Sequence, residues 1–219
     1  MPRWGIHLDI ATKILDSNKT IDKNLFLFGN ILPDIQVGYM VPDVSNIVKY
    51  DISHYELKNG TTMYMNFYQS NIDKMNEPIF MGYFTHLVAD YCFNTRLKKQ
   101  YIFNEQGDFI GYKNIQDEVI KSDKSATLQD KHIELEKLEN YIYNKNKIEL
   151  PHYESLLLNK SNEIENINIV NSDVEKAIKI TKESKENPKF EEFDFNILTE
   201  EEWENEISNT LDIVKEFIK

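Results

Sequence analysis

The chain has 219 residues, of which 41% are hydrophobic and 28% are charged, with seven glycines, six prolines and one cysteine. This length suits one globular domain, and the scarcity of glycine and proline favours long helices over a turn-rich sandwich or barrel. The single cysteine, Cys92, excludes a disulfide framework, and no apolar run approaches the ~20 residues of a membrane span. Because the N-terminus has no secretory pattern, we expect a cytoplasmic protein.

The formal net charge of −12 is unevenly distributed along the chain. Residues 1–100 carry ten Lys/Arg and ten Asp/Glu, whereas residues 101–219 carry fifteen and twenty-seven. An acidic chain without a basic stripe is poorly suited to nucleic acid or to an anionic membrane. We therefore expect neither a nucleic acid duplex as partner nor stable membrane insertion.

Helical patterns dominate the first sixty residues. Apolar spacing predicts a helix over residues 5–16. The apolar run at residues 25–28 ends at Gly29-Asn30, and residues 35–52 are predicted to form a loop. Ser53-His54-Tyr55-Glu56 has the spacing of a capping box and predicts the start of a short helix.

The next segments include the strongest helix prediction. Asn59-Gly60 predicts a turn, and residues 61–75 are predicted to be helical. A long helix is predicted from Pro78 to Lys98, because proline suits a first helical position and large apolar side chains recur at helical spacing. Alternating aromatic and polar residues over 101–112 predict a short hairpin.

Four further helices are predicted in the second half. One covers residues 126–143, with a stripe made of Leu128, His132, Leu135, Leu138 and Ile142. Pro151 opens a short helix through Leu158, and capping boxes at residues 172–175 and 199–202 predict two more. The expected fold class is all-α, a single helical domain over residues 1–219. In it, residues 1–158 form a bundle, and residues 159–219 form an acidic C-terminal helical extension packed on it.

The sharpest chemical signal is the pair His86 and Asp90. Positions four apart share one face of a helix, so this imidazole and this carboxylate can bind the same metal ion. The pair lies in an apolar segment, where an unpaired carboxylate is costly. A buried His–Asp hydrogen bond is the alternative. His7 on the stripe of the first helix, Asp34 after Pro33, and His54 add three further candidate donors.

The order of these elements is recognisable. It runs from His7 through Phe26-Leu27-Phe28-Gly29-Asn30-Ile31-Leu32-Pro33-Asp34 and His54 to Gly82-Tyr83-Phe84-Thr85-His86-Leu87-Val88-Ala89-Asp90. The ordered set resembles the zinc-dependent phospholipase C family, whose all-helical fold is shared with single-strand-specific zinc nucleases. The resemblance covers about the first hundred residues. It implies a bundle of the zinc-dependent phospholipase C type.

The resemblance also implies a ligand set for zinc. Asp34, His54, His86 and Asp90 would hold one ion, and Asp90 would bridge to a second ion that His7 also binds. In the family, an N-terminal tryptophan completes the second ion, and Trp4 stands near that place.

A third ion of the family uses a histidine soon after the His-x-x-x-Asp pair and then a His-x-x-x-Glu pair. His132 and Glu136 have the latter spacing and are candidate ligands. Arg96 stands where the first of these histidines would be, so two zinc ions are expected rather than three.

The implied activity is hydrolysis of a phosphate ester or phosphodiester. Zinc with nitrogen and oxygen ligands lowers the pKa of a bound water toward ~7, and two ions can stabilise both the attacking and the leaving oxygen. Asp34 is the candidate general base, in addition to its role as a ligand. The expected substrate is a small, soluble phosphoester.

Two alternatives stay open. The first is a non-catalytic helical binding protein with a structural or vestigial metal site. The second is an HD-type phosphohydrolase, which ranks lower because no histidine in the chain is followed directly by aspartate.

Overall fold

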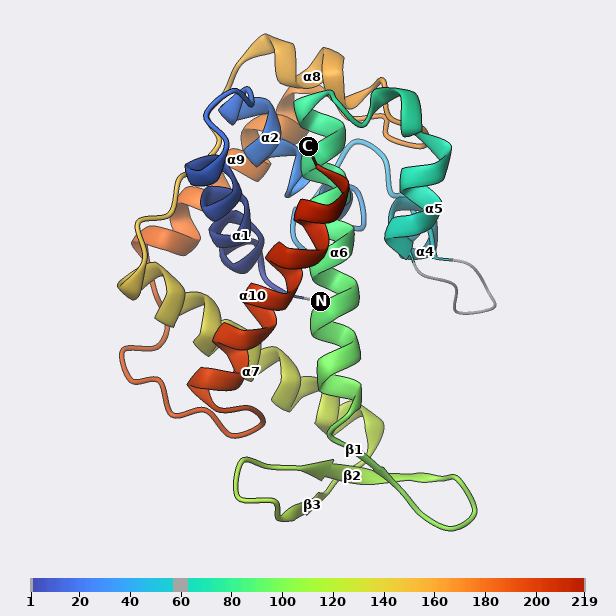
Figure 1. Ribbon diagram of the computed structural model, residues 1–219, viewed down its shortest axis with the longest axis vertical. Coiled ribbons are helices and arrows are strands. Elements are labelled where there is room, and N and C mark those ends of the chain that lie inside the picture. Colours follow the sequence, from blue (N-terminus) through green and yellow to red (C-terminus); the bar gives the residue numbers. More distant parts are fainter. Residues whose placement is uncertain (1, 57–62, 219) are drawn as a thin grey trace.

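The computed structural model describes residues 2–56 and 63–218. Helix α6 (Pro78–Lys98) runs through the middle of the molecule, and most other helices pack around it (Figure 1). The prediction for this helix is confirmed at both ends. Its side chains are buried on several faces, which is expected of a helix enclosed by others rather than lying on a surface.

Five short or medium helices make up the rest of the N-terminal half. They are α1 (Trp4–Ser17), α2 (Lys23–Gly29), α3 (Leu32–Ile35), α4 (Tyr50–Ser53) and α5 (Met63–Ser70), and a 3-10 turn follows at Ile72–Lys74. The helix predicted over residues 5–16 is confirmed as α1. Asp22 caps α2, because its carboxylate accepts a hydrogen bond from the Leu25 N–H at 3.1 Å. The turn predicted at Asn59-Gly60 lies outside the described residues.

Two local predictions in this half are wrong. We expected a loop after Pro33 to aim Asp34 inward, but Pro33 fits the first turn of a helix and α3 forms around it, with Asp34 inside that helix. Ser53 does not begin a helix either. It ends α4, and His54 is the C-cap residue, since Tyr55 has a φ of 54° and cannot continue a right-handed helix.

A small antiparallel sheet follows α6. Its strands β1 (Tyr101–Phe103), β2 (Phe109–Lys113) and β3 (Val119–Lys121) lie in the order β1-β2-β3. The hairpin predicted over residues 101–112 is confirmed, but the third strand was not expected. The fold is therefore mostly helical rather than strictly all-α.

Four helices complete the chain. They are α7 (Lys124–Lys145), α8 (Ser155–Ser161), α9 (Asn171–Glu186) and α10 (Glu200–Phe217). The capping box at Thr199 is confirmed, since the Thr199 N–H donates to Glu202 and the Glu202 N–H donates to the Thr199 hydroxyl. The box predicted at Ser172 is displaced, because Asp173 accepts from the Val170 N–H and places the cap at Val170.

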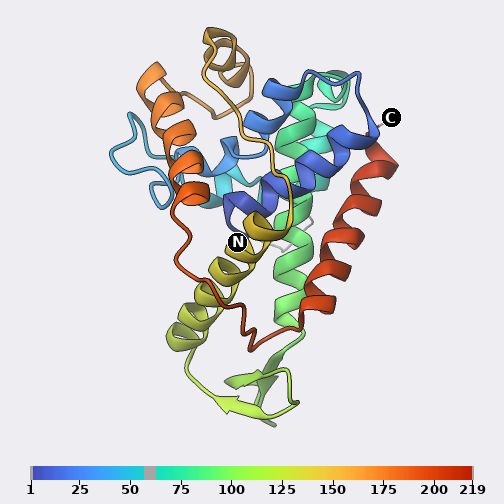
Figure 2. The same cartoon turned by 90° about the vertical axis from the view of Figure 1, so that its left-hand side faces the viewer.

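The segment from 159 to 218 packs into the same core as the first half. Helix α10 lies alongside α6 in two perpendicular views (Figures 1 and 2). The rings of Trp203 and Phe93 stack with centroids 5.7 Å apart, and Trp203 and Val214 are fully buried. Among the described residues, no helix is both long and apolar enough to cross a lipid bilayer.

Candidate metal centre

Side chains from α1, α3, α6 and the end of α4 meet in the interior. They form a cluster, here called the His/Asp cluster, made of His7, Asp34, His54, His86 and Asp90. Each of these residues is 0% exposed. Because a charged or polar group is rarely buried without compensation, these five groups must either satisfy one another or share a bound cation.

A close helix crossing brings α2 and α3 to α6. A Cβ atom at Gly82 would lie 2.3 Å from the Phe26 carbonyl oxygen, and one at Gly29 would lie 2.4 Å from the Ile79 carbonyl oxygen. Only glycine fits at both positions. As a result the Asn30 carbonyl oxygen, at the end of α2, lies 2.7 Å from Nδ1 of His86.

The donor atoms form two groups of three, one from Asp34, His54 and His86 and one from His7, His86 and Asp90, and within each group they lie no more than 4.8 Å apart. Nε2 of His54 lies 3.3 Å from Nε2 of His86 and 3.4 Å from a carboxylate oxygen of both Asp34 and Asp90. Nε2 of His86 lies 3.9 Å from each of the two carboxylates. Four ligands at zinc bond lengths of about 2.0–2.1 Å stand ~3.3–3.4 Å apart in a tetrahedron. The donor atoms around His54 and His86 are therefore close enough together to hold a metal ion.

Backbone carbonyls fix the tautomers of the two central imidazoles. A carbonyl oxygen can only accept, so Nδ1 of His86 carries the proton that is donated to Asn30. Nδ1 of His54 is 3.2 Å from the Tyr50 carbonyl oxygen and 2.8 Å from the Ser53 hydroxyl. Both Nε2 atoms are then left with lone pairs that face each other at 3.3 Å. Two such lone pairs repel unless a metal ion or a proton lies between them.

The carboxylates have their own supporting donors. The indole Nε1–H of Trp4 donates to Asp34 at 3.1 Å, and the hydroxyl of Tyr50 donates to Asp90 at 2.8 Å. The Tyr50 ring also stacks on His54, with centroids 3.8 Å apart. Such outer contacts are typical of metal sites, where they orient the ligands and hold their protonation state.

His7 extends the cluster on the far side of Asp90. Its ring stacks on His86 with centroids 3.9 Å apart, and its Nε2 lies 3.7 Å from Oδ1 of Asp90. Within the described part of the chain, both nitrogens of His7 and the Oδ1 atoms of Asp34 and Asp90 have no hydrogen-bond partner. An unsatisfied buried polar group costs about 1–3 kcal/mol. His7 and Asp90 therefore offer free donor atoms beside His86, and these three residues are a second group that could hold a cation.

Burial sets the protonation states in the cluster. Desolvation, with the neighbouring His86, lowers the pKa of His7 well below its usual value, and desolvation lowers the pKa of His86. For Asp34 and Asp90, burial acts to raise the pKa, but the imidazoles beside them outweigh it and the pKa of each carboxyl is lowered. Neutral imidazoles and ionised carboxylates are the forms that bind metals.

The structure brings together five of the seven predicted ligands and leaves out two. His132 is exposed on α7, so its expected place on the buried stripe is wrong, as is that of Leu128, which is 49% exposed. Glu136 pairs instead with Arg3 at 3.3 Å and with Lys189 at 2.7 Å. The helix is rotated so that Lys131, Leu135 and Leu138 face inward. A His-x-x-x-Glu spacing alone could not reveal this rotation.

Tyr50 is the functional candidate that sequence reasoning missed. It stands four residues before His54, which is the spacing of one helical turn, and this spacing was the available signal. Lys131 was missed as well. It is 8% exposed, and its ammonium donates to Asn94 at 2.7 Å, one turn after Asp90 on α6.

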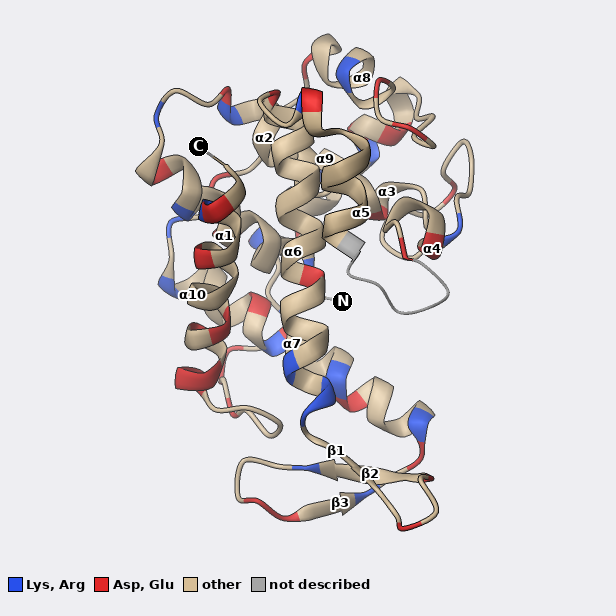
Figure 3. Ribbon diagram, turned by 45° about the vertical axis from the view of Figure 1, so that its right-hand side comes forward, with Lys and Arg blue, Asp and Glu red and all other residues tan. Residues whose placement is uncertain are grey.

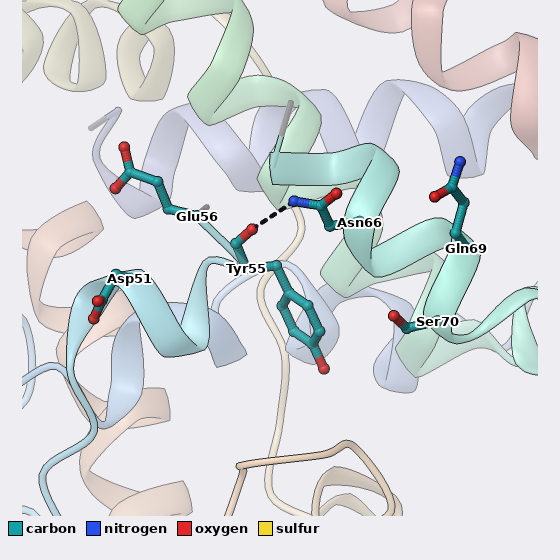
Figure 4. A pocket seen from close by; sticks show the side chains of 6 residues that line it. All are labelled: Asp51, Tyr55, Glu56, Asn66, Gln69 and Ser70. Atoms are coloured by element: carbon teal, nitrogen blue, oxygen red, sulfur yellow. Dashed lines mark hydrogen bonds between the residues drawn. The ribbon is translucent and has the colours of Figure 1, made fainter. Parts of the chain in front are cut away.

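A cavity of about 450 Å³ lies between α4 and α5 (Figure 4). Its lining consists of Asp51, Tyr55, Glu56, Asn66, Gln69 and Ser70, and none of these belongs to the His/Asp cluster. Asn66 donates to the Tyr55 carbonyl oxygen at 3.0 Å, which ties α5 to the chain after α4. In this conformation a cation held by the cluster would be enclosed by protein.

Comparison of the chain with protein-family models, with curated proteins and with solved structures gives no match. Conclusions about the cluster therefore depend on its own geometry and chemistry.

Proposed function

We propose that this protein is a metal-dependent hydrolase of phosphate esters or phosphodiesters, built on a bundle of the zinc-dependent phospholipase C type. The observation that carries the proposal is the facing pair of Nε2 lone pairs on His54 and His86, flanked by the carboxylates of Asp34 and Asp90. Imidazole and carboxylate donors gathered this closely suit zinc better than magnesium or calcium, which prefer oxygen ligands alone.

The donor set also supports a catalytic role. Structural zinc sites are mostly built from cysteine thiolates with histidine, whereas carboxylate and histidine ligands are typical of hydrolytic sites. The one cysteine, Cys92, bonds weakly to Asn209 and is not part of the cluster. The adjacent position between His7 and Asp90 would allow a second ion bridged by the Asp90 carboxylate, as in two-metal phosphoesterases.

The residues around the ions have separable roles. Bound zinc supplies hydroxide at neutral pH by lowering the pKa of its water toward ~7. One oxygen of Asp34 accepts from the Trp4 indole, and its Oδ1, 3.4 Å from Nε2 of His54, would either bind the ion or accept a proton from the attacking water. The buried ammonium of Lys131 on α7 donates to Asn94, which lies one turn after Asp90 on α6, and its positive charge would complement an anionic phosphate.

Metal content and turnover test the proposal together. Protein purified without a histidine tag should contain one to two zinc ions per chain by elemental analysis, and it should hydrolyse bis(p-nitrophenyl) phosphate or p-nitrophenyl phosphate. His86→Ala should lose most of the metal and the activity. His152→Ala is the matched control, because His152 is exposed and pairs only with Glu154. Equal zinc content in the two variants would contradict the assignment.

A structural metal site is the second candidate function. The complete burial of all five cluster residues favours it, since structural zinc sites are closed and catalytic ones keep an open position. The expected result would then be full zinc loading, a large drop in thermal stability after chelation, and no turnover of any phosphoester in a panel of monoesters and diesters. Turnover that is lost in Asp34→Asn while zinc is retained would decide for the hydrolase.

A further inference from the structure

A second cavity lies at the C-terminal end of α6, where the sheet meets the start of α7. Its volume is about 420 Å³, which is within the range of small-molecule sites. It is lined by side chains from the end of α6, from β1 and β2, and from the first turns of α7, namely Lys98, Tyr101, Phe103, Phe109, Lys124 and Leu128. None of these residues takes part in the proposed hydrolase site.

The walls of this cavity are aromatic and partly open to solvent. The Phe109 ring stands nearly perpendicular to Tyr101 and to Phe103, with centroids 5.4 and 5.9 Å apart. Phe103 is 55% exposed and Leu128 is 49% exposed. Large apolar side chains gathered around a hollow, rather than scattered singly, are characteristic of a ligand-binding surface. The cavity therefore suits an apolar body.

Two cations stand at this apolar hollow. Neither Lys98 nor Lys124 has an ion-pair partner among the residues that the structure describes, although the chain as a whole carries a net charge of −12. Figure 3 shows basic positions where α6, the sheet and α7 meet. Lys124 is also the first residue of α7, so the positive end of the helix dipole reinforces its charge. Asp123, which caps α7 by accepting from the Ala126 N–H, offsets part of this potential.

We propose that this cavity binds a single amphiphilic anion. The aromatic walls would hold an alkyl chain or a ring, and Lys98 and Lys124 would hold a carboxylate or phosphate head group. A monomeric ligand is favoured over an anionic membrane because a protein of charge −12 is repelled by such a surface. A small anion responds chiefly to charges within the ~8 Å Debye length, where the two lysines dominate.

Three ligands with the same ten-carbon chain test the role of charge. Decanoate, 1-decanol and decyltrimethylammonium are titrated into the full-length, metal-loaded protein by NMR below their micellar concentrations. We expect saturable binding in the order decanoate, decanol, decyltrimethylammonium, with decanoate about fivefold or more tighter than decanol. Shifts confined to the cavity residues support the site. Binding to phosphatidylglycerol vesicles without saturable binding of decanoate would assign the face to membranes and overturn the proposal.

Two variants separate the charge from the apolar walls. In the double variant Lys98→Met/Lys124→Met the advantage of decanoate over decanol should disappear, while decanol binding is retained. Phe109→Ala should weaken both ligands. Lys215→Met is the control, because Lys215 occupies an exposed position of α10 away from this cavity, and it should leave both affinities unchanged. An undiminished preference for decanoate in the double variant would overturn the role of the two lysines, whatever the outcome for the metal centre.

Discussion

At the scale of single residues, the His/Asp cluster depends on groups that do not themselves face a cation. Tyr50 is the clearest of these, because it stacks on His54 and donates its hydroxyl to Asp90. Burial, reinforced by Asp90, raises the pKa of this phenol, so it stays a donor at every ordinary pH. It therefore holds the Asp90 carboxylate in the rotamer that faces both His54 and His7.

Tyr50→Phe isolates that single hydrogen bond, since the ring stack is kept. We expect zinc affinity to fall by about 10–100-fold, which is the usual effect of losing an outer-shell contact. Competition with a chromophoric chelator measures it. Tyr39→Phe makes the same chemical change at a side chain that is 77% exposed and should leave the affinity unaltered. Equal affinities in the two variants would remove Tyr50 from the metal site.

The buried histidines predict how the metal-free protein responds to acid. Because the pKa values of His7 and His86 are lowered in the folded protein, the unfolded chain binds more protons below its ordinary histidine pKa of about 6.5. The stabilising contribution of the neutral rings is complete above that pH and is lost as the pH falls. The lowered carboxyl pKa values of Asp34 and Asp90 matter only nearer pH 4, so they add little in this window.

We expect the free energy of unfolding of chelated protein to drop by about 1–3 kcal/mol between pH 7.5 and 5.5. Urea denaturation at the two pH values measures this drop. His7→Asn should lose a substantial part of the pH dependence. His152→Asn, which changes an exposed histidine outside the cluster, should keep all of it. A pH-independent free energy in the parent protein would show that His7 and His86 titrate normally.

Single residues also show which parts of the candidate site the sequence could predict. His86 and Asp90 were predictable because a four-residue spacing on one helix fixes their relative direction. His7, Asp34 and His54 were candidates from their local positions, but only their order in the resemblance joined them to one site, since no local rule brings three separate elements together. His132 and Glu136 failed because the rotation of α7 depends on what it packs against, and its buried face includes Lys131 and Glu134 rather than the most apolar stripe.

At the scale of elements, the crossing of α2 and α6 controls the position of the cluster. Alanine at position 82 would gain about 1 kcal/mol in helix propensity if space were available. Its Cβ would instead lie 2.3 Å from the backbone oxygen of Phe26, so the two helices must separate. That movement would carry Asn30 away from His86 and Asp34 away from His54.

We therefore expect Gly82→Ala to destabilise the fold by about 1–3 kcal/mol and to weaken zinc binding. Thermal unfolding with and without chelator separates the two effects. Ser208→Ala, at an exposed position of α10, is the control for a small change on a helix and should stay within about 0.5 kcal/mol. If Gly82→Ala had the same free energy of unfolding as the parent, α2 and α6 would be able to move apart at this crossing without cost.

Element boundaries were predictable where one side chain dictates them. Pro78 and Thr199 each mark the start of a helix in this way. The third strand was not predicted, because the turn before it has no glycine. The turn before β2 has Gly107 at a φ of 85°, and the turn before β3 has Asp117 at a φ of 60° in the equivalent place. Asn104 and Asn114 accept backbone N–H groups in the same way in the two turns. The repeat of that asparagine was the usable signal.

At the scale of the whole molecule, the acidic C-terminal segment is joined to the rest by buried contacts. The Glu134 carboxylate on α7 accepts the N–H groups of Asn196 and Ile197 at 2.9 and 2.8 Å, which holds the chain before α10. Asp173 on α9 accepts the Ser45 N–H at 3.0 Å and so holds the segment between α3 and α4. The acidic composition of this segment could not predict the structural roles of Glu134 and Asp173, because a net charge does not say which carboxylates are buried or which N–H groups they accept.

A chain ending at residue 158 tests how much the first part can do alone. The shortened chain lacks Trp203 and Val214, so the face of α6 around Phe93 would be exposed. It also lacks the buried side chains of Ile164 and Leu198. In all, ten large apolar side chains between residues 159 and 218 are buried. Fully burying each is worth about 1.5–3 kcal/mol, so the lost total of about 15–30 kcal/mol exceeds the 5–15 kcal/mol by which a typical domain is stable.

We expect the 1–158 chain to keep helical far-ultraviolet circular dichroism but to lose the near-ultraviolet signal and a cooperative urea transition, and to bind zinc weakly. Full-length Trp203→Phe, which keeps an aromatic ring against Phe93, should unfold cooperatively at a lower urea concentration than the parent. If the 1–158 chain unfolds cooperatively and binds zinc with the affinity of the full chain, α10 is an accessory layer. The metal centre would then need only the residues of the first 158 positions.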